Sequence, residues 1–306
     1  MLSKRVMAGL PLGLAVAITG CGGSSSNKQA AQTTHQASAV AAASSQSGSA
    51  GSGSTTPMPS PQSGTAGGGS SGAMMEAHTG AHLNVLSPAP GTVVTGQSVP
   101  FRVAISNFKV ECSSAGTPDR AGVGHYHVTL DGSLINMYCA PHGQVSMLDV
   151  KPGKHVIGFI PASNEHADDM KAAKMIPIDY QPSSTPAPVA PLHFPAGPQI
   201  EILSPRPGET VHGSMTMRIA VKNFQLSCAM YGKPDVAGYG HWHLNMDSTT
   251  MGMMGMGTMF RMSCEHTLSF SLAHVKPGNH RFFAILEDNQ HAPTPHAMAS
   301  VNVNVR

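Results

Sequence analysis

The feature that most constrains the fold is an internal duplication that fills the last two thirds of the chain. Val85–Gly91 matches Ile202–Gly208 at an offset of 117 residues, and a Gly-x-Gly-His-x-His motif then recurs at an offset of 116. Later matches have an offset of 125, so the second copy carries nine extra residues between Asp247 and Cys264. The matches keep one order along each copy. The chain therefore contains two copies of one folding unit of about 100 residues.

Each copy has the pattern of short strands separated by turns. Alternating apolar residues indicate strands at 101–105, 176–180, 217–221 and 301–305. Pro-Gly pairs indicate turns at 90–91, 152–153, 207–208 and 277–278. No stretch has a convincing helical apolar face, and only a turn near 168–174 is a candidate for helix. We therefore expect an all-β chain of two tandem immunoglobulin-like or cupredoxin-like β-sandwich repeats, at residues 82–180 and 199–306. Residues 181–198 are Pro-rich and are expected to form the linker between them.

The N-terminus has the pattern of an export signal. Lys4 and Arg5 precede an apolar run that is too short to span a bilayer, and Ile-Thr-Gly-Cys closes it at Cys21. Residues 1–20 resemble a bacterial lipoprotein signal peptide with its lipobox. The resemblance implies cleavage before Cys21, a diacylglycerol on its sulfur, and a mature protein anchored by lipid outside the cytoplasm, on the cell membrane or the outer membrane. An ordinary secretory signal with an incidental cysteine is the alternative.

Composition limits the partners of the chain. Residues 21–81 are rich in Ser, Gly and Ala, so they are expected to form a disordered tether. Only 11% of residues are charged, the net charge is +2, and no Lys/Arg-rich run occurs, which argues against a nucleic-acid partner. The chain has 17 histidines and 20 methionines, which together outnumber its 34 charged residues. These side chains are borderline and soft ligands for transition metals.

The repeated His-x-His element is the first candidate binding site. It consists of His125 and His127 in the first copy and of His241 and His243 in the second. Residues two apart in a strand point to the same face, so each pair places two imidazoles about 7 Å apart along the chain. Such a pair can chelate copper or zinc. The alternative is a structural role on a polar strand face, hydrogen-bonded to Asp131 or Asp247.

Two further histidines recur in each copy. His155 and His280 follow the Pro-Gly turns, and His166 and His291 follow an Asn-x pair. A metal site shared by all four histidines of a copy and separate structural roles are both open.

The repeated motifs resemble a known pattern. Gly-x-Gly-His-x-His-x-x-x-Asp, then Pro-Gly-x-His, then Asn-x-His, is similar to an uncharacterised bacterial envelope domain that carries Gly-His-His-His-Leu-Leu-Ile-Asp. That pattern has a third histidine where this chain has Tyr126 or Trp242. The resemblance implies an exported β-rich domain and brings no established activity.

A second resemblance involves the cysteines. Cys139, His142 and Met147 have the spacing of the copper loop of plastocyanin-type cupredoxins, which implies a blue-copper site completed by His125 or His127. The second copy departs from that spacing, because it has only Cys264-Glu-His266. The competing interpretation is two disulfides, one per copy, each worth roughly 3–4 kcal/mol. The pairs would be Cys112 with Cys139 and Cys228 with Cys264.

The insertion in the second copy points to copper. It and its flanks hold Met251, Met253, Met254, Met256, Met259 and Met262, interleaved with glycines. Thioether sulfur is a soft ligand that suits Cu(I) and has little affinity for zinc or calcium. The alternative is a flexible apolar loop that binds a partner.

Together these patterns predict a lipid-anchored envelope protein that binds or buffers copper through histidine and methionine. Its partners would be the membrane and a protein that donates or accepts copper. A non-catalytic adhesion or scaffold lipoprotein is the alternative from a different class, and a copper-dependent redox enzyme is the third. The sequence has no Gly-x-Ser-x-Gly motif, no phosphate-cradling loop followed by a helix and no His-Glu-x-x-His motif, so catalysis is the least favoured.

Overall fold

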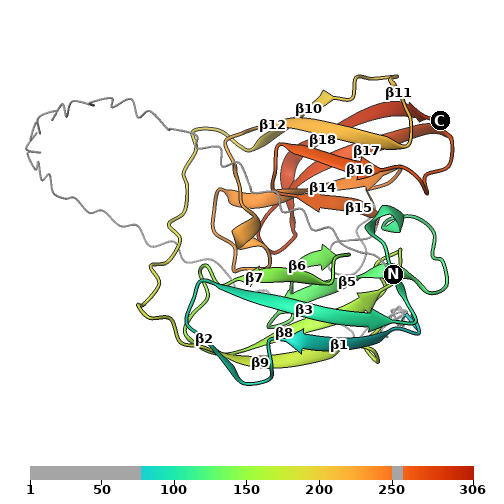
Figure 1. Ribbon diagram of the computed structural model, residues 1–306. Helices are drawn as coiled ribbons and strands as arrows, with labels where there is room; N and C mark the ends of the chain where they lie inside the picture. Colours follow the sequence, from blue (N-terminus) through green and yellow to red (C-terminus); the bar gives the residue numbers. More distant parts are fainter. Residues whose placement is uncertain (1–76, 250–257) are drawn as a thin grey trace, which may run out of the picture. The chain divides into compact units, whose positions relative to one another are not determined.

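The computed structural model describes residues 77–249 and 258–306, and it is built almost entirely of strands (Figure 1). Repeat 1 (82–180) contains β1 His82–Ser87, β2 Thr92–Val94, β3 Ser98–Ser106, β4 Lys109–Val110, β5 Val123–Leu130, β6 Ser133–Tyr138, β7 His142–Ser146, β8 Gly153–Ala162 and β9 Lys174–Tyr180. Repeat 2 (199–306) contains β10 Gln199–Ser204, β11 Thr210–Val211, β12 Ser214–Lys222, β13 Gln225–Leu226, β14 Tyr239–Met246, β15 Met259–Ser263, β16 Thr267–Ser271, β17 Gly278–Glu287 and β18 Pro293–Val305. Two short 3-10 turns, η1 Cys112–Ser114 and η2 Cys228–Met230, occupy equivalent places.

The two repeats have the same sheet topology. In repeat 1 a three-stranded sheet has the order β1-β3-β7, and the larger sheet has the order β2-β9-β8-β5-β4 with β6 paired to β5. In repeat 2 the corresponding orders are β10-β12-β16 and β11-β18-β17-β14-β13, with β15 paired to β14. The predicted pair of tandem β-sandwiches is confirmed, and the strands expected from alternation are β3, β9, β12 and β18. Figure 1 shows repeat 1 in teal to yellow-green and repeat 2 in yellow to red.

Each sandwich has its own aromatic core. In repeat 1 the rings of Phe101 and Phe159 pack edge to face with centroids 5.1 Å apart, and both side chains are buried. In repeat 2 Phe260 and Phe270 pack in the same way at 5.3 Å. The middle residue of each His-x-His element, Tyr126 or Trp242, also points into the core, because it alternates with the histidines.

Glycines with positive φ support the predicted turns. Gly91 and Gly208, which end the Pro-Gly pairs before β2 and β11, both have a φ of 79°. This is the left-handed region, which glycine occupies without steric cost. The peptide bonds Ser87–Pro88 and Ser204–Pro205 are cis in both copies. The duplication therefore extends to details of backbone conformation.

Strands β5 and β14 are buried on both faces. Every residue from Gly124 to Leu130 is buried, and so is every residue from Gly240 to Leu244. One face of each strand lies on the sandwich core. Residues 77–249 and 258–306 belong to one compact unit, in which side chains of repeat 2, such as Tyr231, Met259 and Met262, belong to the same apolar cluster as the core of repeat 1. Burial of the outer face therefore coincides with contact between the repeats. Across residues 77–249 and 258–306, no helix has the length and hydropathy needed to cross a membrane.

Candidate metal centres

Three histidine nitrogens converge in repeat 1. His125 and His127 extend from the outer face of β5, and His166 reaches them from the loop after β8. The Nε2 atom of His125 lies 3.0 Å from His127 Nε2 and 3.0 Å from His166 Nδ1, and the last two atoms are 3.4 Å apart. These three residues are called triad 1.

The same arrangement occurs in repeat 2. His241 and His243 lie on β14, and His291 comes from the loop after β17. His241 Nε2 is 3.0 Å from His243 Nε2 and 2.9 Å from His291 Nδ1, and the distance between His243 Nε2 and His291 Nδ1 is 3.2 Å. These residues form triad 2. Each triad brings its three candidate ligand atoms within 4.8 Å of one another.

The size of each triangle matches that of three nitrogens around one metal ion. Two imidazole nitrogens bound to an ion at about 2.0 Å with a tetrahedral angle lie about 3.3 Å apart. The observed separations run from 2.9 to 3.4 Å. A small inward or outward movement of the rings would give ideal bond lengths, so the residues present fit a metal ion.

The third histidine of each triad has an unusual backbone conformation. His166 and His291 have φ values of 64° and 65°, in the left-handed region. Each sits in a tight turn, in which its amide donates to the carbonyl oxygen three residues earlier, on Ser163 or Asp288. Such conformations cost free energy outside glycine and cluster at functional sites. Both copies keep this conformation, and it aims the ring at the His-x-His pair.

The second nitrogens of the rings fix which nitrogen carries the proton. His166 Nε2 donates to the carbonyl oxygen of Met259 at 2.7 Å, and His291 Nε2 donates to that of Leu134 at 2.9 Å. Because a carbonyl only accepts, the Nδ1 atoms of these rings carry lone pairs that face the triad centres. Ligand histidines in metal sites are usually held in this way, by a carbonyl or carboxylate on the other nitrogen.

An acidic side chain lies beside Nδ1 of the second histidine of each pair. Asp168 Oδ1 accepts from His127 Nδ1 at 2.7 Å. In repeat 2 the carboxylate comes from another position, Glu287 on β17, whose Oε1 lies 3.6 Å from His243 Nδ1. Asp168 and Glu287 are not equivalent in the duplication. Each copy therefore places an acidic side chain beside this histidine from a different position in the sequence, and only Asp168 is within hydrogen-bonding distance.

Glu287 is a buried acid without a hydrogen-bond partner. Its side chain is fully buried, and neither carboxyl oxygen has a hydrogen-bond partner in the described part of the chain. Burial raises its pKa to about 9, and the neighbouring charge of Asp288 adds to the effect. A cation held by triad 2 would compensate a negative charge here.

Burial keeps five of the six triad histidines neutral. Burial lowers the pKa of His125, His241 and His243 well below the ordinary value, and charges on neighbouring histidines add to this. Burial also lowers the pKa of His166, to about 3, and that of His291. Neutral imidazole is the form that binds metals. These five histidines are therefore in the ligating form even in mildly acidic surroundings.

A methionine neighbours each triad. Met137 on β6 pairs directly with His127, and Met262 on β15 pairs directly with His243. Directly paired residues share one face of a sheet, with Cβ atoms about 5 Å apart. Both methionines are only 8% exposed. Each triad therefore has a soft thioether group beside it.

The structure separates His155 and His280 from the triads. His155 Nδ1 is bonded to Asp131 at 2.6 Å and its Nε2 to the carbonyl of Lys151 at 2.8 Å. His280 makes the equivalent contacts at 2.7 Å with Asp247 and Lys276. Both ring nitrogens are thus engaged by protein groups. The hydrogen bonds to Asp131 and Asp247 that were considered for the His-x-His histidines are therefore made by His155 and His280.

The cysteines form disulfides. Cys112 is bonded to Cys139 and Cys228 to Cys264, with Cα atoms 5.6 and 5.2 Å apart. The sulfur of Cys139 is therefore already bonded to another sulfur. His142 is exposed, whereas the Met147 side chain is fully buried in the core of repeat 1.

The remaining candidates lie in the core, at an exposed turn or outside the described residues. Met259 is fully buried, and its carbonyl oxygen accepts a hydrogen bond from His166 of triad 1. His266 is exposed at the turn before β16. Cys21 and the methionines at 251, 253, 254 and 256 lie outside the described residues.

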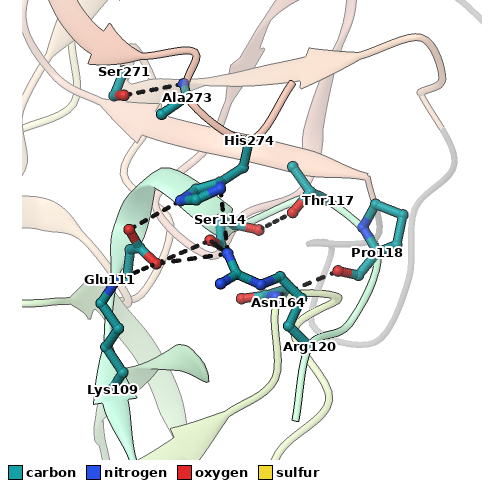
Figure 2. Close-up of polar contacts among 10 residues, drawn as sticks. All are labelled: Lys109, Glu111, Ser114, Thr117, Pro118, Arg120, Asn164, Ser271, Ala273 and His274. Carbon is teal, nitrogen blue, oxygen red and sulfur yellow. Dashed lines mark hydrogen bonds and ion pairs between the residues drawn. The ribbon is translucent and has the colours of Figure 1, made fainter. Parts of the chain in front are cut away.

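Polar contacts also join the repeats away from the triads. Glu111 of repeat 1 accepts a hydrogen bond from His274 of repeat 2 at 3.0 Å, and Arg120 Nη1 lies 3.2 Å from the other nitrogen of that ring (Figure 2). Lys233, which is 1% exposed, donates to the carbonyl of Ser146 at 2.7 Å. The inter-repeat contact is thus polar as well as apolar.

Asp168, Glu287 and Met137 are site residues that the sequence patterns did not indicate. Asp168 lies two residues after His166, a spacing that could have signalled a carboxylate partner. Glu287 and Met137 carry no such signal, because only strand pairing places them beside the histidines.

Comparisons with known proteins add little to this geometry. No known protein family matches the sequence, and no curated protein does. Among solved structures, the fibronectin(III)-like modules of CbhA from Clostridium thermocellum share 12% identity, cover 35% of this chain and 96% of their own, and give a TM-score of 0.24. The four N-terminal Ig domains of Dscam1 share 9% identity over 73% of this chain and 45% of theirs, with a TM-score of 0.21. A tetra-tandem repeat from the extending region of a large adhesion protein shares 8% identity over 74% and 48%, with a TM-score of 0.21. The chain therefore spans less than half the length of the last two.

Proposed function

We propose that this chain is an exported, lipid-anchored protein that binds or buffers copper in two buried three-histidine sites. One observation carries the proposal: in each repeat three imidazole nitrogens converge within 3.4 Å, and two of the three rings have their other nitrogen facing a carbonyl or carboxylate oxygen. Without an ion or a shared proton, the lone pairs of a triad would repel one another. A metal ion satisfies all three at once.

The surroundings of the triads favour copper. Neutral imidazole binds both copper and zinc, whereas the thioethers of Met137 and Met262 suit Cu(I). The described cysteines are in disulfides and offer no thiolate for zinc. The methionine-rich insertion adds further soft ligands, which would pass Cu(I) to or from triad 2 in this proposal.

Burial favours holding the ion over reacting with a substrate. The triad histidines are at most 5% exposed. A catalytic metal needs an open coordination position that a substrate can reach. A buried three-histidine site instead suits storage or transfer, in which opening of the protein controls exchange.

The test is copper titration of the full chain, purified from an oxidising compartment. We expect about two coppers per chain, one for each triad. A variant with His125→Ala and His127→Ala should bind one fewer, and adding His241→Ala with His243→Ala should abolish high-affinity binding. The matched control carries His155→Ala and His280→Ala, which removes repeated histidines outside the triads. Unchanged stoichiometry in the triad variants would contradict the proposal.

A second titration addresses the insertion. Replacing Met251, Met253, Met254 and Met256 with serine should lower the capacity for Cu(I) while leaving Cu(II) binding to the triads intact. Thioethers bind Cu(I) in preference to Cu(II). An equal loss of both oxidation states would mean that the variant had disturbed the triads.

A structural or interaction role is the second candidate. His166 and His291 each donate a hydrogen bond to the opposite repeat, and a brace between repeats would need the same bonds. In that case the chain would bind no copper at micromolar concentration, while the triad variants would still lose stability.

A further inference from the structure

The third histidine of each triad is held by the other repeat. His166 of repeat 1 donates to the carbonyl of Met259 on β15, and His291 of repeat 2 donates to the carbonyl of Leu134 on β6. Leu134 and Met259 are equivalent in the duplication, because both precede the second cysteine of their repeat by five residues. The two contacts are therefore reciprocal, as at the interface of a twofold-symmetric dimer.

A glycine permits each of these contacts. Gly116 has a φ of 72°, and a Cβ atom there would lie 2.7 Å from the carbonyl oxygen of Met259. Gly232, its equivalent, has a φ of 64°, and a Cβ atom there would collide with the carbonyl of Leu134. Each glycine amide also donates to the backbone of the turn that carries the third histidine, Gly116 to Asn164 at 2.8 Å. Each glycine therefore lets the turn that carries the third histidine lie close to a strand of the other repeat, β15 for His166 and β6 for His291.

The strand that holds one triad also neighbours the other. The carbonyl oxygen of Met259 on β15 accepts a hydrogen bond from His166 of triad 1, and the same strand places Met262 beside His243 of triad 2. The carbonyl oxygen of Leu134 on β6 accepts a hydrogen bond from His291 of triad 2, and this strand places Met137 beside His127 of triad 1. The two sites thus share structural elements.

We infer that each metal site is completed by the opposite repeat, so that metal binding and association of the two repeats are thermodynamically linked. Strand β15 positions His166 for the site of triad 1 (site 1), and strand β6 positions His291 for the site of triad 2 (site 2). This inference rests on the proposed metal-binding function and deepens it. If association of the repeats strengthens metal binding, then metal binding must strengthen association by the same factor.

The first experiment separates the carbonyl contact from general strain. In a background that retains only site 1 (His241→Ala with His243→Ala), Gly116→Ala should weaken Cu(I) affinity by 10- to 100-fold, the usual effect of losing a partner that orients a ligand histidine. The matched control is Gly122→Ala. Gly122 has a similar φ of 69°, but a Cβ atom there meets nothing within 4 Å. Its Cu(I) affinity should stay within about twofold of the background.

The mirror experiment uses site 2. In a background that retains only site 2 (His125→Ala with His127→Ala), Gly232→Ala should weaken Cu(I) affinity, with Gly208→Ala as the control in open space. X-ray absorption should then show fewer than three imidazole ligands per copper. Equal affinities for the glycine variants and their controls would overturn the inference, while copper binding by the parent chain would leave the proposed function standing.

The second experiment needs no substitution near the triads. A protease site inserted at Ser183–Thr185, an exposed stretch of the linker, allows the chain to be cut between the folded repeats. We expect the halves to dissociate at least tenfold less readily with Cu(I) than with chelator. If the cut chain binds copper but its halves dissociate equally readily with and without copper, the inference is overturned. This result tests the inference even if a glycine variant fails to fold. A parent chain that binds no copper would instead remove the proposed function and this inference together.

Discussion

The carboxyl group of Glu287 is the clearest difference between the triads at the level of single residues. The equivalent position in repeat 1 is Ala162, so only repeat 2 has an acid on this strand beside its histidines. A buried acid with no hydrogen-bond partner in the described chain destabilises the metal-free fold. A cation bound by triad 2 would compensate the charge of this group and remove the penalty.

Replacing Glu287 with glutamine should stabilise the metal-free protein at alkaline pH. The folded-state pKa of about 9 lies above the ordinary 4.5, so folding takes up a proton between these values and stability falls as the pH rises through this window. At pH 8 Glu287→Gln should raise the free energy of unfolding by more than about 1 kcal/mol, with little change at pH 4. Chemical denaturation at both pH values measures this.

The control for that experiment is Glu265→Gln, an exposed acid in the same repeat. It should leave the pH dependence of stability unchanged. An identical pH slope in Glu287→Gln and the parent chain would show that Glu287 is not held in an unfavourable environment. Copper should reduce the difference between them, because a cation in triad 2 compensates the carboxylate charge.

At the level of secondary-structure elements, the paired strands β5–β6 and β14–β15 build each site. Strand alternation puts the two histidines on one face, and the cross-strand partner adds a methionine to the same face. The methionine would select the metal, while the histidines supply most of the affinity.

Leucine in place of these methionines should therefore change metal preference. Met137→Leu with Met262→Leu should weaken Cu(I) binding by about tenfold and leave Zn(II) binding nearly unchanged, because leucine keeps the volume and removes the soft sulfur. Competition titrations with each metal give the two affinities. Met147→Leu, in the core of repeat 1, is the matched control. Parallel losses of both metals would indicate a packing defect.

The sequence predicts these elements better than it predicts the site. Alternation identified β3, β9, β12 and β18, and the period of two placed His125 and His127 on one face. The sequence could not distinguish His166 from His155 as the third histidine of the triad, since both follow repeated motifs. Only the fold shows that the turn after β8 crosses to the His-x-His pair, whereas His155 braces Asp131 at the other end of that strand.

At the level of the whole molecule, the contact between repeats combines reciprocal and non-reciprocal interactions. The histidine-to-carbonyl bonds occur twice, once in each direction. The Glu111–His274 contact occurs once, because the equivalent positions hold Ser227 and Asp149 (Figure 2). The sequence revealed the two copies but not their packing, since residues that face each other across repeats share no local pattern.

The single contact should make part of the stability depend on acid pH. The hydrogen bond from His274 lowers the pKa of Glu111 from 4.5 to about 2, so its contribution is complete above pH 4.5 and is lost as the pH falls towards 2. Glu111→Gln should lower the free energy of unfolding at pH 6 by less than about 1 kcal/mol, because the pair contacts solvent. Urea denaturation at pH 6 and pH 2.5 should show the difference disappearing in acid. Glu201→Gln, an exposed acid on β10, should show no such convergence.

The reciprocal contact has a consequence for how the two halves can change. In a homodimer one gene specifies both sides, so every substitution appears twice. Here Leu134 and Met259 are encoded separately, and so are Ala162 and Glu287. One half can gain a carboxylate or a methionine-rich insertion while the other keeps its original chemistry. Tandem linkage thus allows two paired centres to acquire different affinities within a single polypeptide.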